Sequence, residues 1–189
     1  MNPDGHNQSW ITDTDTDSLI GVFSMDGQQI AYWSFDLQTQ ISKLWVMDLE
    51  TGSSKPVTTE GTNFMNPVSW SPDGSYIAFE DTLSEDQAMD VFRVGVYDGE
   101  LLNLTEDSSF RDGAPAWSPD GQWIAFHSNR AGEQAESEDI WLMSPDGADL
   151  RNLTSKTLPW SDRFPAWSPD GSRIAFYRQG SVSDAISSA

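Results

Sequence analysis

The stretch Pro165–Phe176 reads Pro-Ala-Trp-Ser-Pro-Asp-Gly-Ser-Arg-Ile-Ala-Phe, and its central motif, Trp-Ser-Pro-Asp-Gly, recurs along the chain. Copies begin at Trp70, Trp117 and Trp167, and a weaker copy, Phe-Ser-Met-Asp-Gly, begins at Phe23. The starts are 47, 47 and 50 residues apart. A fixed period of this length is typical of an array of one supersecondary unit. The 189 residues are therefore expected to contain about four repeats.

Each copy of the motif predicts a tight turn between two strands. Proline presets φ at the second turn position, Asp tolerates the third, and Gly takes a left-handed φ that other side chains resist. The Pro-Ala-Trp or Pro-Val-Ser-Trp segment before the turn predicts a short strand with proline at its start. The strands after the turn share the pattern Ile-Ala-aromatic and are expected over residues 28–32, 75–79, 122–126 and 172–176.

Three copies continue with a third strand rich in β-branched and aromatic residues, a glycine-containing turn and a fourth strand that ends in threonine. No segment shows apolar spacing at i, i+3, i+4 and i+7, so helix should be nearly absent. We expect an all-β fold, a β-propeller of about four repeats of four antiparallel strands, here named A to D. The third strands are expected over residues 43–48, 90–96 and 139–143, and the fourth strands end at Thr58, Thr105 and Thr154.

The repeat resembles that of the TolB-type β-propeller family, which also occurs in the propeller domains of prolyl-oligopeptidase-family serine peptidases. The resemblance rests on Asp139-Ile-Trp-Leu-Met, on Asn152-Leu-Thr and on Pro165–Phe176, and it extends over almost the whole chain. It implies a fold and no particular activity, because related propellers serve as docking domains, sugar or peptide binders, and gates over enzymes. A periplasmic or secreted location is favoured by this resemblance alone.

Residues 1–189 are expected to form one propeller domain. The segment from Trp10 to Thr12 resembles the ends of the fourth strands, so it would complete the last blade and close a four-bladed ring. The alternative is that the chain forms part of a larger propeller. A closed ring predicts a monomer, and an open one predicts self-association through bare blade faces.

The charge of the chain is strongly negative, with 30 acidic residues against 10 basic ones and a formal net charge of −20. Binding of nucleic acid requires clustered Lys and Arg, so we expect no nucleic-acid partner. No apolar run approaches the roughly 20 residues that cross a bilayer, so we expect no membrane insertion. The acidity indicates a well-hydrated surface, and a basic partner or a cation remains an open alternative.

Loops joining B to C and D to A should lie on one face of a propeller, and the A–B and C–D turns on the other. The B–C loops, expected over residues 33–42, 80–89 and 127–138, are long and unlike one another. Variable loops on a rigid scaffold are typical of a binding face, and the alternative is that they are solvated connections. Two of these loops carry the acidic residues Glu80, Asp81, Glu85, Asp86, Glu133, Glu136 and Glu138.

Two groups of residues are candidate binding sites on this face. Asp112 and Asp162 each lie three residues before a strand-A proline, a position that the family resemblance places at the channel mouth. Alternatively, their side chains cap the loop amides that follow. The second group is a polar and aromatic cluster that would grip a carboxylate or a peptide end, and it consists of His127, Asn129, Arg130, Trp160 and Arg163. The alternative is that these are ordinary surface residues.

Asp13, Asp15 and Asp17 alternate along the chain, as carboxylate ligands do in calcium-binding loops. The match is partial, because Ser18 stands where a calcium-binding helix-loop-helix has glycine. Calcium binding by these residues is therefore one hypothesis, and a polar D–A loop is the other. No further cofactor is expected.

The sequence has no glycine-rich phosphate loop, no Cys/His metal motif and no Gly-x-Ser-x-Gly nucleophile elbow. His127 also has no evident Ser or Cys partner in the sequence. We therefore expect that the chain is not an enzyme. The leading hypothesis is a non-catalytic propeller that binds a protein or peptide through the B–C and D–A loop face. One alternative is the gating propeller of a serine peptidase without its hydrolase domain. The other is a carbohydrate- or cation-binding propeller.

Overall fold

The fold was analysed in a computed structural model, which describes residues 4, 6, 12, 17–39, 41–58, 67–82, 89–106, 110–131, 137–155 and 160–180. These residues form fourteen β-strands and no helix, which confirms the predicted all-β class. Accordingly, no helix with the length and apolar character needed to cross a bilayer is found within these ranges.

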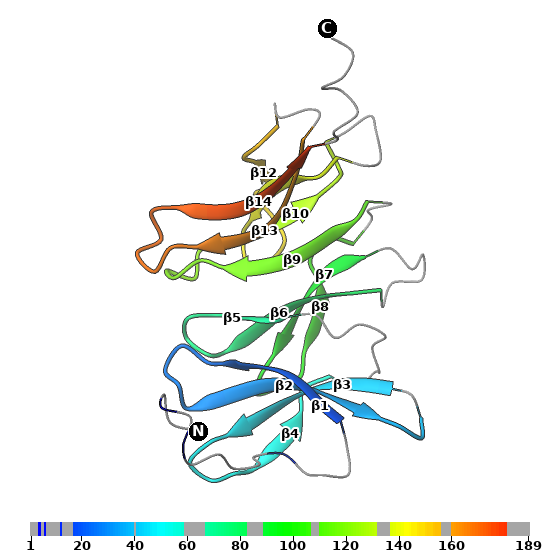
Figure 1. Ribbon diagram of the computed structural model, residues 1–189, viewed down its shortest axis with the longest axis vertical. Helices are drawn as coiled ribbons and strands as arrows, with labels where there is room; N and C mark the ends of the chain where they lie inside the picture. The colour runs from blue at the N-terminus through cyan, green and yellow to red at the C-terminus, as the bar shows by residue number, and fades with distance from the viewer. Residues whose placement is uncertain are drawn as a thin grey trace, which may run out of the picture.

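The strands form three four-stranded antiparallel sheets and one hairpin, named blades 1 to 4 in chain order. Figure 1 shows them stacked from the blue and cyan sheet to the orange and red hairpin. Blade 1 contains β1 (Asp17–Phe23), β2 (Gln29–Asp36), β3 (Ile41–Asp48) and β4 (Ser54–Pro56), and blade 2 contains β5 (Ser69–Trp70), β6 (Tyr76–Asp81), β7 (Asp90–Gly95) and β8 (Leu101–Asn103). Blade 3 contains β9 (Asp112–Trp117), β10 (Ile124–Ser128), β11 (Asp139–Met143) and β12 (Arg151–Asn152), and blade 4 contains β13 (Trp160–Trp167) and β14 (Ile174–Gly180).

The repeated motif builds the A–B turn of every blade in the predicted way. Its serine Oγ donates to Asp Oδ1 at 2.6–2.7 Å. The same Oδ1 accepts the backbone N–H two residues further on at 3.0 Å. These bonds, the serine's first, lower the pKa of Asp26, Asp73, Asp120 and Asp170. The motif glycines have φ between 69° and 72°, and they are Gly27, Gly74, Gly121 and Gly171.

The first B–C connection is much shorter than the predicted loop over residues 33–42. Strands β2 and β3 remain paired from Gln29 opposite Asp48 to Asp36 opposite Ile41. Trp33 is completely buried in this extension. Burial of a large apolar side chain stabilises additional strand at a position where the sequence suggested a loop.

Strand A begins earlier than expected in blades 3 and 4, at Asp112 and at Trp160, so Trp160 and Arg163 lie in β13 itself. A bulge at Ala114 and at Phe164, with φ of 47° and 54°, interrupts the pairing with strand B. No sequence signal marks these bulges, because residues other than glycine rarely adopt such a φ and proline argues against a continuing strand.

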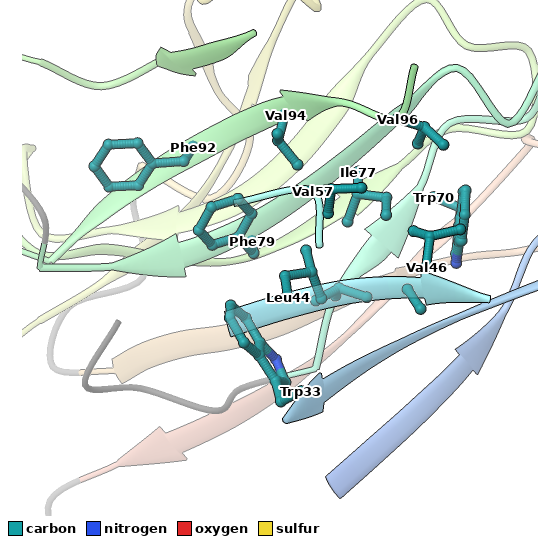
Figure 2. Packing of buried hydrophobic residues seen from close by; sticks show 12 residues of the cluster. Trp33, Leu44, Val46, Val57, Trp70, Ile77, Phe79, Phe92, Val94 and Val96 are labelled. Carbon is teal, nitrogen blue, oxygen red and sulfur yellow. The ribbon is translucent and has the colours of Figure 1, made fainter. Parts of the chain in front are cut away.

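The hydrophobic core lies between the blades. In Figure 2, Trp33 and Leu44 of blade 1 face Phe79 of blade 2. The Trp33 ring meets Phe79 edge-on at 5.8 Å, and Phe79 stacks on Phe92 at the same centroid distance. Burial of such rings between sheets is the main stabilising contribution that a blade gains from its neighbour.

The Ile-Ala-aromatic pattern serves two interfaces at once, because side chains alternate along a strand. In blade 2, Ile77 and Phe79 pack towards blade 1, whereas Ala78 packs towards blade 3. The motif tryptophans also join neighbouring blades, since Trp70 Nε1 donates to the carbonyl of Val22 at 3.0 Å. The scaffold motifs are thus largely devoted to inter-blade packing.

The described strands form an open array. Blades 1 and 4 lie at opposite ends of the molecule in Figure 1, so these strands do not close a four-bladed ring. This arrangement corresponds to the second of the two predicted architectures, part of a larger propeller. The predicted strand at Trp10 to Thr12 falls outside the described residues except for Thr12, so its role in the last blade stays a prediction.

Candidate functional site

One position of the repeat places different side chains between consecutive blades. It directly follows the Ile-Ala-aromatic pattern and is occupied by Trp33, Glu80, His127 and Tyr177. In blade 1 this residue contributes to the apolar core. In blades 2 and 3 it supplies a carboxylate and an imidazole near the ends of β6 and β10. The loop face therefore carries titratable groups inside two blade interfaces.

Glu80 crosses from blade 2 to blade 3, where its Oε2 accepts a hydrogen bond from the backbone N–H of Ala114 in the β9 bulge. Burial raises the pKa of Glu80, and the charge of Glu138 acts in the same direction. The Ala114 amide and the nearby Arg111 guanidinium oppose the rise. Gly113 makes this approach feasible, because a Cβ there would overlap Glu80 Oε2.

His127 is 8% exposed and lies between blades 3 and 4. Its ring meets Phe164 of β13 edge-on, at 5.6 Å between centroids and 69° between planes. Burial first, and then the charges of Arg163 and Arg111, lower the pKa of His127 to about 4. Its Nδ1 is buried and has no hydrogen-bond partner among the described residues. The imidazole is consequently neutral at physiological pH.

Glu138 and Arg163 join blade 3 to blade 4 beside this histidine. The buried Glu138 precedes β11, and its Oε2 forms an ion pair with Arg163 Nε. Ser161 Oγ donates to the same carboxylate at 3.4 Å, and the Asp162 amide donates to the Glu138 carbonyl at 2.7 Å. The Arg163 side chain is one-third exposed, so its guanidinium is both fixed and within reach of a ligand.

Asp112 and Asp162 are fully buried, and each pairs with an arginine of its own blade. Arg130 follows β10, and Arg178 lies within β14. Arg130 Nη2 lies 2.7 Å from Asp112 Oδ2. Arg178 pairs with Asp162 through two bonds, Nε to Oδ1 at 2.6 Å and Nη2 to Oδ2 at 2.7 Å. Buried charges of this kind are tolerated when they are paired and hydrogen-bonded.

The site combines this buried polar cluster with exposed aromatic rings. Phe164 is 60% exposed although its ring touches His127, and Trp160 is 44% exposed at the start of β13. Of the predicted cluster, the structure thus brings His127 and Arg163 together. Arg130 is held at Asp112 and by Ser128 Oγ at 3.0 Å.

Sequence reasoning missed several members of the site. Arg111 and Phe164 were not expected to contribute, and Glu80 and Glu138 were recognised only as acidic loop residues. A signal for Glu80 was present, because the residue after Ile-Ala-aromatic changes character from one repeat to the next. Phe164 carries no such signal, since its place in the site depends on the bulge in β13.

The predicted calcium ligands lie almost entirely beyond the described ranges. Asp13 and Asp15 fall outside them, and Asp17 is the first residue of β1. Calcium binding by these residues therefore stays a prediction. Within the described parts of the chain, no three His, Cys, Asp or Glu side chains are grouped so that they could hold a metal ion.

Comparison with known proteins identifies the repeat. The sequence profile of the TolB beta propeller domain matches residues 1–188. No curated protein has a significant sequence match to the chain. Among solved structures, TolB from Acinetobacter baumannii superposes with a TM-score of 0.72 and 23% sequence identity, over 95% of this chain and 42% of that one.

Two enzymes share the fold as well. A prolyl endopeptidase superposes with a TM-score of 0.62 and 18% identity, over 94% of this chain and 26% of that one. Oligogalacturonate lyase from Vibrio parahaemolyticus superposes with a TM-score of 0.59 and 18% sequence identity, over 90% of this chain and 62% of that one. These similarities concern the fold alone. The chain spans less than half the length of the Acinetobacter TolB that it matches.

Proposed function

Since the chain belongs to the TolB beta propeller domain family, we propose that it is a non-catalytic scaffold that binds a protein or peptide through its loop face. The observation that carries this proposal is the cluster in which exposed Trp160 and Phe164 lie on the same strand as Arg163, whose ion pair joins two blades. Aromatic residues and arginine are the side chains most enriched at protein interfaces.

The cluster suits a ligand with an apolar side chain next to a backbone carbonyl or a carboxylate. The ring of Phe164 offers the apolar contact, and the outer N–H groups of Arg163 offer hydrogen bonds. Glu138 holds the arginine, and the β13 bulge holds the ring beside His127. Such preorganisation reduces the ordering cost of binding.

The surroundings of His127 support binding in preference to catalysis. A nucleophile and base pair needs a hydroxyl or thiol within hydrogen-bond reach of the imidazole. Among the described residues, Nδ1 of this histidine has no hydrogen-bond partner, and the chain contains no cysteine. With its pKa lowered to about 4, His127 is also a poor base at neutral pH.

Selection of phage-displayed peptides on the purified chain, followed by calorimetry, tests the proposal. We expect Phe164→Ala and Trp160→Ala each to lower the affinity for the selected peptides about tenfold, because each removes a central aromatic contact. Tyr97→Ala is the matched control, because Tyr97 is 72% exposed beside the C–D turn of blade 2, on the opposite face from the cluster. Peptides that bind equally to all three variants, or that the chain hydrolyses, would contradict the proposal.

The second candidate is the gating propeller of a serine peptidase, favoured by the prolyl endopeptidase that shares the fold over 94% of this chain. A coding frame that continues into a hydrolase domain would support this candidate. For the cation-binding alternative, calorimetric titration with calcium is the test, with Asp15→Asn as the variant. A heat of calcium binding that is lost in the Asp15→Asn variant would support the cation-binding alternative. Absence of any heat with the unsubstituted chain would exclude calcium binding.

A further inference from the structure

The opposite face of the propeller, formed by the turns, has a hollow of about 310 Å³ between blades 2 and 3. Its walls include the rings of Pro72, Tyr76, Trp117 and Pro145, and its charged lining residues are Asp73 and Asp120. Both carboxylates belong to the repeated turn motif, one in each blade. The hollow therefore combines flat apolar walls with negative charge, on a surface that the loop-face function does not use.

The electrostatic balance around the hollow is negative. Hydrogen bonds from the motif serines, and then from backbone amides, keep the pKa of Asp73 and Asp120 low, so both are ionised at neutral pH. Arg93 supplies a positive charge beside the hollow, where it donates to the Pro145 carbonyl at 2.8 Å. Its charge also lowers the pKa of Asp146 in the adjacent turn. The surroundings of the hollow thus carry three carboxylates, those of Asp73, Asp120 and Asp146, and one guanidinium, that of Arg93.

Stacking of guanidinium groups on aromatic rings already occurs on this face. Arg93 lies over Tyr76 and Arg151 lies over Trp123, both at 4.3 Å from the ring centroid. A guanidinium is planar and weakly hydrated, and it combines ring stacking with forked hydrogen bonds to carboxylates. Aromatic and proline walls with carboxylates between them therefore suit this group better than an ammonium or an anion.

Trp117 provides a reporter for the hollow. It is 8% exposed, and its Nε1 has no hydrogen-bond partner among the described residues. By contrast, Nε1 of Trp70 and of Trp167 donate to carbonyls of the preceding blade at 3.0 and 3.1 Å. The indole N–H of Trp117 should therefore have a chemical shift of its own.

We propose that this hollow is a docking site for an arginine side chain presented by a partner polypeptide. The net charge of −20 attracts a basic partner, and the hollow adds the local carboxylates and rings that select a guanidinium. The volume of about 310 Å³ accommodates one long side chain. This docking site lies on the turn face and is independent of the proposed loop-face function.

Titration of the ¹⁵N-labelled chain with N-acetyl-L-arginine amide tests the proposal by NMR. We expect a saturable shift of the Trp117 indole resonance, assigned with Trp117→Phe. Asp73→Asn and Asp120→Asn should each weaken binding about two- to fivefold, in keeping with exposed charge pairs. Asparagine retains the oxygen that accepts the turn hydrogen bonds, and an otherwise unchanged spectrum establishes that the variants are folded.

Three controls make the test decisive. Asp170→Asn alters the same turn in blade 4, which does not line the hollow, and should leave the affinity unchanged. The neutral isostere N-acetyl-L-citrulline amide should bind at least fivefold more weakly. Phe164→Ala, a loop-face variant, should have no effect. No saturable shift, equal shifts with citrulline, or equal weakening by Asp170→Asn would each overturn the proposal.

Discussion

The buried His127 makes the stability of the fold depend on pH. Its pKa in the fold, about 4, lies below the ordinary value of 6.5, so the unfolded chain binds the proton more readily. The stabilising contribution of the neutral ring is complete above pH 6.5 and is lost as the pH falls towards 4, by about 3 kcal/mol. An NMR titration of the ring protons should give a midpoint near 4.

The second histidine makes this assignment simple. The chain contains only His6 and His127, so His6→Ala leaves a single imidazole to follow. In His127→Asn the free energy of unfolding, measured with urea, should change less between pH 7 and pH 4.5 than in the parent. A His127 midpoint above pH 6 would contradict the buried and neutral environment described above.

Gly113 permits the close approach of blades 2 and 3. A Cβ at this position would lie 3.0 Å from His127 Nε2 and would overlap the Glu80 carboxylate, which is itself fixed by the Ala114 amide. We expect Gly113→Ala to cost about 1–3 kcal/mol in thermal or urea unfolding, as overpacking does. In a Glu80→Ala background the same substitution should cost clearly less. An equal loss of unfolding free energy in the two backgrounds would show that the strain does not come from the Glu80 carboxylate.

At the scale of elements, the motif glycine acts through its backbone alone. Gly74 has φ of 72°, and an added Cβ would meet nothing within 4 Å. Gly74→Ala should therefore lower the free energy of unfolding by about 1 kcal/mol through backbone strain, with no steric contribution. Gly74→Asn should cost less, because asparagine tolerates left-handed φ. Equal melting temperatures for the two variants would contradict this explanation.

The threonine two residues beyond strand D supports strand C of the same blade. Oγ1 of Thr58, Thr105 and Thr154 accepts a backbone N–H of Leu44, Val91 and Ile140 at 2.9–3.0 Å. Thr105→Val should cost about 1–3 kcal/mol, because the buried Val91 amide would lose its acceptor. Thr105→Ser restores the oxygen and should recover most of that loss in urea unfolding. A serine variant as unstable as the valine variant would point to lost packing.

The elements show how far the sequence alone determines the structure. The turns at Asp73 and Asp120 and the strands after them were predictable, because local turn chemistry and alternating burial produce them. The long β9 and β13 were not, since their bulges at Ala114 and Phe164 require a φ that no residue type signals. The Glu80–Ala114 contact likewise depends on how two blades pack. The sequence therefore predicted where the candidate site lies, on the loop face, but only some of the residues that form it.

At the scale of the whole molecule, the open array leaves the last blade incompletely covered. The residue after Ile-Ala-aromatic faces the next blade, where Trp33 is fully buried, but Tyr177 in blade 4 is 54% exposed. Exposed apolar faces of this kind promote association.

We therefore predict that the chain self-associates through blade 4 as concentration and salt increase. Salt screens the repulsion between copies that each carry a net charge of −20, and it leaves apolar contacts intact. Sedimentation velocity should show a 21.0 kDa monomer at low salt and larger species at high salt. Tyr177→Glu should suppress association, whereas Tyr97→Glu, at a 72% exposed position in blade 2, should not. A compact monomer under all conditions would contradict this prediction.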